Sequence, residues 1–124
     1  MLLPSFEVNL PGAERAVVDV QKLRDYCLSP AHPRGRHKAR VFASALRLFQ
    51  QDAEWLKANL LNAALLDEAR PAEEDEYGQR YVLDFICERN DTRAVIRSGW
   101  IVLRGEGFPR LTTCYVISDE ERHG

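Results

Sequence analysis

Basic side chains gather in one stretch of the sequence, HPRGRHKARVF, which runs from His32 to Phe42. The stretch contains two histidines, three arginines and one lysine, in a chain whose formal net charge is −2. Histidine titrates near neutral pH, and fixed cations beside it can hold a phosphate and stabilise charge that develops on phosphorus. These residue types indicate either a phosphate-binding site equipped to cleave a phosphodiester or a solvated basic surface.

Several of these cations lie at the expected start of a helix over residues 35–50, namely Arg34, Arg36, His37 and Lys38. Free N–H groups at a helix N-terminus attract anions, whereas exposed cations there cost about 0.3–1 kcal/mol each. A sequence that places several cations at this end favours an anion-binding role. Solvated arginines with one histidine capping the helix would also explain the pattern.

Helical spacing separates Lys38 from its basic neighbours. Phe42, Ala45, Leu46 and Phe49 form an apolar stripe, and Lys38 precedes Phe42 by four residues. Residues four apart lie on the same helix face, so Lys38 is expected to point toward whatever the helix packs against. Arg40, Ser44 and Arg47 fall on the solvent side.

The expected strands carry further polar candidates. They are Arg97 and Trp100 on the middle strand of a predicted meander, and Arg110, Thr113 and Tyr115 on its last strand. Strict alternation predicts that Thr113 and Tyr115 share one face with Leu111 and Ile117, while Arg110, Thr112 and Cys114 share the other. The hydroxyls of Thr113 and Tyr115 could contact one phosphate or base. Cross-strand packing, with Trp100 and Tyr115 as core aromatics, is the alternative.

Missing signatures narrow the function classes. The sequence has no phosphate-binding glycine loop, no nucleophile elbow and no zinc-ligand spacing, so neither a cofactor nor a metal is expected. Cys27, Cys87 and Cys114 are odd in number and widely separated, which predicts buried thiols of a cytoplasmic protein. No apolar run approaches the ~20 residues of a membrane span, so no membrane association is expected.

The chain of 124 residues is expected to form a single α+β domain over 1–124. An extended arm with a short strand at RAVV (15–18) covers 1–18, helices occupy 19–69, and an acidic linker follows. An antiparallel meander covers 79–118, where the apolar period changes to two, and a charged tail covers 119–124. Two to three N-terminal helices would then pack on a three- to four-stranded antiparallel sheet.

Three segments resemble a family of small bacterial proteins that bears a domain-of-unknown-function label: KLRDYCLSPAHPRGRHKARVF, YGQRYVLDFICE and RSGWIVLRGEGFPRLTTCYVI. Its members show K-L-x-x-Y-L-L, then H-P-x-G-x-x-K-A-R-x-F, and late in the chain P-R-L-V-T-A-Y. They occur alone and at the ends of large secreted effectors, as toxins of polymorphic and toxin–antitoxin systems do. The order of helices followed by a small sheet is also similar to the barnase, EndoU, colicin and RelE superfamily of metal-independent ribonucleases.

The resemblance, whose matching positions are Lys38, Arg40, Trp100, Arg110, Thr113 and Tyr115, and the basic helix start together predict a toxin-like endoribonuclease that needs no metal. Its catalytic groups would be His37, Lys38, Arg40, Arg110, Thr113 and Tyr115, with Arg36, Arg97 and Trp100 binding substrate. RNA would be the substrate, and a small cognate antitoxin or immunity protein a partner. The alternative is a non-catalytic interaction module of the antitoxin, immunity or structural type, whose basic helix start docks an acidic protein surface.

Overall fold

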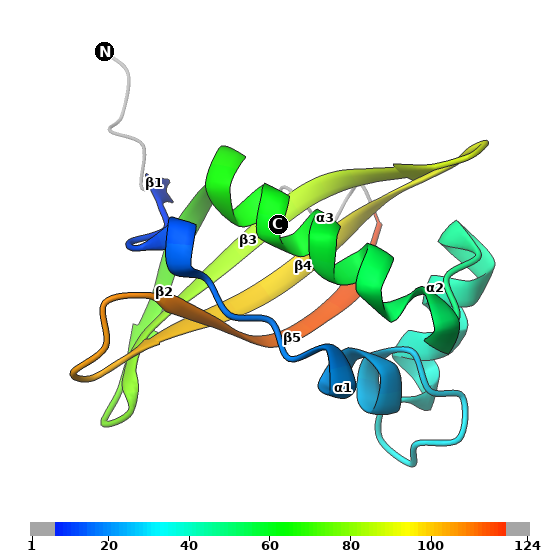
Figure 1. Cartoon of the computed structure of the whole chain (residues 1–124), viewed down its shortest axis with the longest axis horizontal. Coiled ribbons are helices and arrows are strands. Elements are labelled where there is room, and N and C mark those ends of the chain that lie inside the picture. Colours follow the sequence, from blue (N-terminus) through cyan, green and yellow to red (C-terminus); the bar gives the residue numbers. More distant parts are fainter. Residues whose placement is uncertain (1–6, 119–124) are drawn as a thin grey trace.

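A computed structural model describes residues 7–118 as an α+β fold (Figure 1). The elements in chain order are β1 (Val8–Asn9), the 3-10 turn η1 (Ala13–Arg15), α1 (Val20–Lys22), the π-helical turn η2 (Leu23–Cys27), α2 (Arg36–Leu46), the 3-10 turn η3 (Gln50–Asp52), α3 (Ala53–Leu66), β2 (Glu68–Glu74), β3 (Gly78–Arg89), β4 (Thr92–Leu103) and β5 (Pro109–Ile117). The α+β class is therefore confirmed. The expected tail over 119–124 lies outside the described residues.

The sheet is antiparallel and has five strands in the order β1-β2-β3-β4-β5, more than the three to four expected, because β1 and β2 add to it. The predicted meander corresponds to β3, β4 and β5, whose β-branched and aromatic residues suit a pleated sheet. Asn90 and Asp91 form the turn between β3 and β4, and Asn90 has the left-handed φ of 54° that such a tight turn requires.

Two expectations about the other strands were wrong. The acidic segment predicted to be a linker forms most of β2. The RAVV segment does not form a strand, and its contact with the sheet is a single parallel bridge between Val17 and Arg110. The backbone of β2 pairs with β3 while its charged side chains remain exposed, as is common near a sheet edge. The hydropathy of its side chains therefore does not distinguish such a strand from a solvated linker.

The helices follow local signals closely. The Asp19 carboxylate caps α1 by accepting hydrogen bonds from the backbone N–H groups of Gln21 and Lys22. Helix α2 ends at Leu46 rather than at Gln50, because Arg47 adopts a left-handed φ of 53° and the Leu48 N–H bonds the Phe42 carbonyl. A residue in the left-handed conformation just after the last helical turn is a common way for a helix to end.

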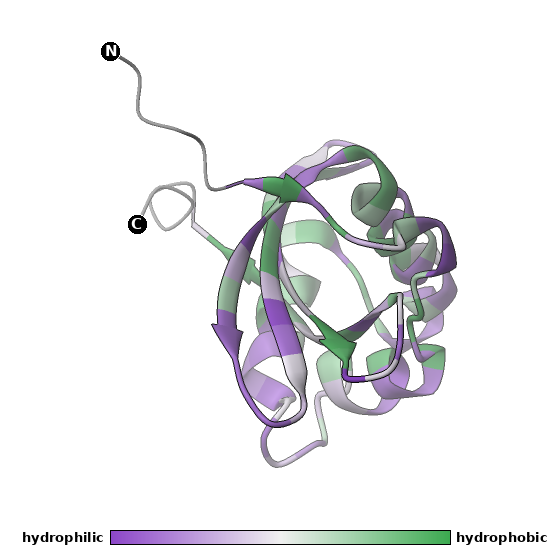
Figure 2. Ribbon diagram, turned by 90° about the vertical axis from the view of Figure 1, so that its left-hand side faces the viewer, coloured by the Kyte–Doolittle hydropathy of each residue, from purple (hydrophilic) through white to green (hydrophobic). Residues whose placement is uncertain are grey.

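The core lies between the helices and one face of the curved sheet (Figure 2). We call this the inner face of the sheet and its opposite the outer face. Leu83, Ile96 and Trp100 of the sheet are buried with Phe42 of α2 and Leu60 of α3. The outer face carries the polar side chains that concern function, because alternation sends every second residue away from the core.

Because β5 contains a bulge, its side chains are divided between the two faces of the sheet differently from the prediction. Gly99 pairs with Thr113 but Trp100 pairs with Leu111, so Thr112 is an extra residue in β5. Leu111 therefore turns to the inner face, away from Thr113. Arg110 lies on the outer face with Thr113, contrary to strict alternation.

Candidate functional site

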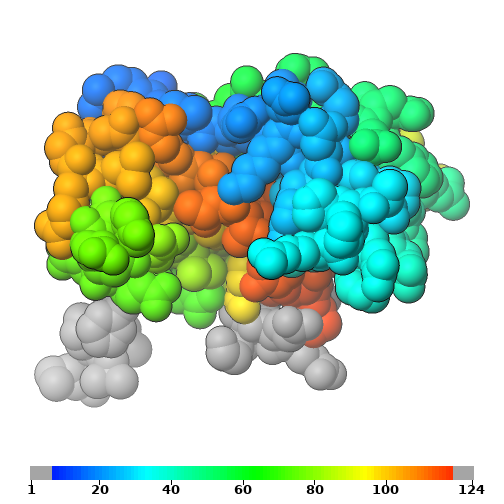
Figure 3. All heavy atoms as spheres, turned by 90° about the horizontal axis from the view of Figure 1, so that it is seen from below, coloured from blue at the N-terminus to red at the C-terminus, as the bar shows by residue number. Residues whose placement is uncertain are grey.

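Lys38 of α2 reaches across to strand β5. Its ammonium nitrogen donates a hydrogen bond to the Thr113 hydroxyl at 3.2 Å and lies 4.8 Å from the centre of the Tyr115 ring. The side chains of all three residues are half-buried. In Figure 3 the orange-red surface of β5 is visible between the cyan segment that precedes α2 and the orange β4–β5 turn. Lys38, Thr113 and Tyr115 form what we call the Lys38 site.

Tyr26 and His32 support this site from the segment that precedes α2. The Lys38 ammonium lies 5.9 Å from the Tyr26 ring, and Tyr26 meets the His32 ring edge to face at 4.5 Å. The His32 Nδ1 accepts hydrogen bonds of 3.0 Å from the N–H groups of Arg34 and Gly35. His32, which was not among the predicted site residues, thereby fixes the turn that leads into α2.

A row of polar residues extends from Tyr115 across the outer face. The Arg97 guanidinium donates two hydrogen bonds of 2.9 Å to the Asp84 carboxylate, and Arg70 lies 3.6 Å from the same carboxylate. Arg97 is the cross-strand partner of Tyr115. The pKa of Arg97 is raised, chiefly by the hydrogen bonds to Asp84 and to a smaller extent by the phenol of Tyr115. This row holds Tyr115 beside a fixed cation.

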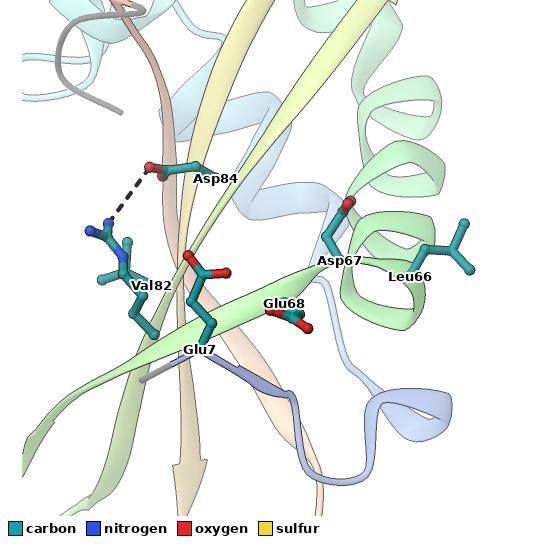
Figure 4. A pocket seen from close by; sticks show the side chains of 7 residues that line it. Glu7, Leu66, Asp67, Glu68, Val82 and Asp84 are labelled. Carbon is teal, nitrogen blue, oxygen red and sulfur yellow. Dashed lines mark ion pairs between the residues drawn. The ribbon is translucent and has the colours of Figure 1, made fainter. Parts of the chain in front are cut away.

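An acidic pocket of about 310 Å³ opens at the far end of the row (Figure 4). Its carboxylates come from Glu7, Asp67, Glu68 and Asp84, and the dashed line in Figure 4 is the ion pair between Asp84 and Arg70. Four carboxylates and one guanidinium, that of Arg70, make the lining of this pocket mainly acidic. Across residues 7–118, no three His, Cys, Asp or Glu side chains are grouped so that they could bind a metal ion.

The structure thus brings together three predicted site residues, Lys38, Thr113 and Tyr115, with Arg97 adjacent. Arg110 is not among them, although it lies on the same face. Its guanidinium donates two hydrogen bonds of 2.8 Å to Glu106 and stacks on the Phe108 ring at 5.1 Å. Arg110 holds the pKa of Glu106 below its ordinary value, so the charge of this arginine is already compensated.

Trp100 does not reach the surface at this site. Its side chain is 1% exposed, and its indole N–H donates to the Ser98 hydroxyl at 2.9 Å. Trp100 is therefore a core aromatic residue, which was the alternative to a role in stacking on a base. No room remains for a base on its ring without unfolding the core.

The remaining predicted residues, Arg36, His37 and Arg40, are exposed along α2. Arg40 follows Lys38 by two residues, which on a helix of 3.6 residues per turn places it on roughly the opposite side. Arg36 and Arg40 line a separate groove with Ala39 and Ala43. Lys38 and Arg40, predicted to act together, therefore face different surfaces.

Two buried thiols lie beneath the Lys38 site. The pKa of Cys27 is lowered to about 7, first by a hydrogen bond from the Cys114 thiol and then by the Cys114 backbone and the charges of Lys38 and Lys22, against the opposing effect of burial. The pKa of Cys114 is raised correspondingly, by the Cys27 thiol and by burial. Burial raises the pKa of Cys87 to about 11. All three cysteines are free and buried, as predicted.

The fold and site define an α+β domain with a lysine held against one strand of a curved antiparallel sheet. Residues 9–118 match the family described as Domain of unknown function (DUF6883), and the chain belongs to this family. No curated protein and no solved structure matches the chain. None of the helices within 7–118 has the length and apolar character needed to cross a bilayer.

Proposed function

We propose that this protein is a metal-independent endoribonuclease of the toxin type, which uses the Lys38 site to bind and cleave RNA. One observation carries the proposal. Lys38 is a half-buried cation whose partners are a neutral hydroxyl and aromatic rings, and no carboxylate among residues 7–118 forms an ion pair with it.

The neighbouring arginines emphasise the contrast. Arg97 and Arg110 each bind a carboxylate through two hydrogen bonds, so their charges are compensated inside the protein. A partly desolvated cation without a counter-ion binds an external anion more strongly than a fully solvated one does. A phosphate seated on Lys38 would also reach the hydroxyls of Thr113 and Tyr115, which are hydrogen-bond donors.

The proposed reaction is an internal transfer at phosphorus. The ribose 2′-oxygen forms a bond to phosphorus while the bond to the 5′-oxygen breaks, leaving a 2′,3′-cyclic phosphate and a 5′-hydroxyl. His37, one residue before Lys38, would take the 2′-hydroxyl proton, and a proton returned to the 5′-oxygen completes the balance. Lys38 would stabilise the charge on the phosphoryl oxygens, while Thr113 and Tyr115 orient the phosphate.

The test is cleavage of a labelled RNA by the purified protein in excess EDTA. We expect 2′,3′-cyclic phosphate ends, a large loss of activity in Lys38→Ala, and a smaller loss in Tyr115→Phe. Arg93→Ala is the matched control, because Arg93 is exposed and has only a 3.7 Å ion pair with Glu88. Absence of cleavage in EDTA, or full activity in Lys38→Ala, would refute the proposal.

The proposal includes a cellular setting. A ribonuclease toxin acting in the cytoplasm would arrest its host, and a small antitoxin or immunity protein would neutralise it. Expression of the wild-type protein should stop growth, and Lys38→Ala should restore it. Growth arrest that persists in Lys38→Ala would contradict this setting.

A non-catalytic binding module is the second candidate, and the position of His37 favours it. His37 is exposed, and within the described chain it makes no hydrogen bond, ion pair or ring contact that would orient it toward Tyr115. A module of this class would bind an anionic partner through Lys38 without cleaving RNA. Salt-dependent RNA binding without products, or binding to an acidic protein alone, would support it.

A further inference from the structure

A second, mainly apolar cavity lies on the other side of α2 from Lys38. Its volume is about 240 Å³, and its apolar lining consists of Leu28, Pro30, Ala39, Ala43, Leu48 and Phe49. The two alanines leave room above α2, while Leu28 and Leu48 are buried and form part of the core. Phe49 is 48% exposed beside the opening. We call this cavity the Arg40 groove.

Two guanidinium groups complete the lining, those of Arg36 and Arg40. They are four residues apart on α2 and so lie on one face of the helix, one turn apart. Both are exposed, and neither forms an ion pair with any carboxylate among residues 7–118. No acidic residue lines the groove. The groove therefore combines an apolar floor with uncompensated positive charge at its side.

We propose that the Arg40 groove binds a small organic anion, with an apolar body on the floor and a carboxylate or phosphate head between Arg36 and Arg40. Guanidinium groups bind both kinds of head through paired hydrogen bonds. Since a water molecule occupies about 30 Å³ in the liquid, the cavity has space for an apolar body of about eight non-hydrogen atoms. A medium-chain fatty carboxylate or an aromatic acid has this size.

The Arg40 groove is distinct from the Lys38 site in geometry and in chemistry. Lys38 faces β5 and is surrounded by hydroxyls and aromatic rings, whereas Arg40 faces Pro30 and Phe49. An RNA phosphate has no apolar body to fill a floor of leucine and alanine. The proposal therefore holds whether or not the protein cleaves RNA.

The test is titration calorimetry of the full chain with octanoate, octyl phosphate, octylammonium and acetate. Octanoate, octyl phosphate or both should bind. Octylammonium should not bind because its head is positive, and acetate should not bind because it has no apolar body. The ratio of the octanoate and octyl phosphate affinities identifies the preferred head. Amide chemical shifts of Ala39, Ala43 and Phe49 should move during the titration.

Variants separate the two parts of the site. Ala43→Leu fills the cavity and should abolish binding, and Arg40→Gln should weaken it about tenfold, as expected for the loss of a charged hydrogen bond. Lys38→Ala should leave octanoate binding unchanged, and Ala43→Leu should leave RNA cleavage unchanged. Failure of both anions to bind, equal binding of octylammonium, or unchanged affinity in Ala43→Leu would each overturn the proposal.

Discussion

The ammonium nitrogen of Lys38 lies 3.2 Å from the hydroxyl oxygen of Thr113, a residue 75 positions later in the chain. This hydrogen bond joins the first turn of α2 to β5, and Tyr115, two residues beyond Thr113, places its ring 4.8 Å from the same nitrogen. The bond leaves the positive charge of Lys38 unneutralised.

Replacing Lys38 with alanine should remove one phosphate contact from any complex with RNA. We expect weaker binding at low salt and a salt dependence whose logarithmic slope is less steep by about one. Fluorescence anisotropy of a labelled single-stranded RNA at several salt concentrations measures both quantities. An unchanged slope in Lys38→Ala, matching that of Arg93→Ala, would show that RNA does not contact this residue.

Breaking the pair between Asp84 and Arg97 should destabilise the fold. The Asp84 side chain is 8% exposed, and Asp84→Ala would remove a buried carboxylate that accepts two hydrogen bonds from Arg97 and pairs with Arg70, at a cost of about 3 kcal/mol. Urea unfolding measures the change. Glu88→Ala is the control, since Glu88 is 72% exposed in its pair with Arg93 and should lose under ~0.5 kcal/mol. Equal losses in the two variants would contradict the expectation.

Ser98 is a polar residue within the core, and its loss should be costly for its size. The Ser98 hydroxyl donates to the Leu83 carbonyl at 2.7 Å and accepts from the Trp100 indole at 2.9 Å. Ser98→Ala would leave the buried Trp100 indole N–H without its acceptor and remove one hydrogen bond to the Leu83 carbonyl, a cost of roughly 1–3 kcal/mol. Thermal unfolding of Ser98→Ala and of the double variant Ser98→Ala, Trp100→Phe tests this, because the double variant removes the orphaned indole N–H as well.

Gly35 allows the chain to pass close to Tyr26. A Cβ at position 35 would lie 2.1 Å from the Tyr26 carbonyl oxygen, so the backbone would have to move. Gly35→Ala should cost about 1–3 kcal/mol and disturb Tyr26 and His32 beside the Lys38 site. Gly107→Ala is the control, since a Cβ there would meet only the end of the flexible Arg15 side chain, at 3.0 Å. A thermal shift no larger than that of the control would refute the clash.

The Cys27 thiol should ionise near neutral pH. Its pKa is about 7 in the folded chain against an ordinary value of 9.0, so the folded state releases this proton before the unfolded state does. Stability from this group should therefore rise with pH between about 7 and 9, and be lost as the pH falls through 7.

Thiolate ultraviolet absorbance measures the Cys27 titration without a reagent entering the core. The signal near pH 7 should disappear in Cys27→Ala and move to higher pH in Lys38→Met, which removes a nearby positive charge. Cys87→Ala should not alter it, because the Cys87 pKa lies near 11. Absence of any thiolate below pH 9 in the wild-type protein would contradict the assignment.

Some cross-strand contacts could be predicted from the sequence. A two-residue turn at Asn90 and Asp91 fixes the β3–β4 register, and this register places Asp84 opposite Arg97. The positions of Arg110 and Thr113 on one face could not be predicted, since a single extra residue at Thr112 reverses the alternation.

The sequence by itself determined the α+β class, the buried cysteines, the three-strand meander and the direction in which Lys38 points, because each follows from local periodicity and turn residues. Only the tertiary structure decided that an acidic segment joins the sheet as β2 and that Lys38 meets Thr113 and Tyr115 while Arg110 is held by Glu106. In β2 most side chains are exposed, so its pairing with β3 depends on backbone hydrogen bonds that the side-chain pattern of this segment does not specify. The charge left uncompensated at Lys38 depends on which side chains the fold brings within reach.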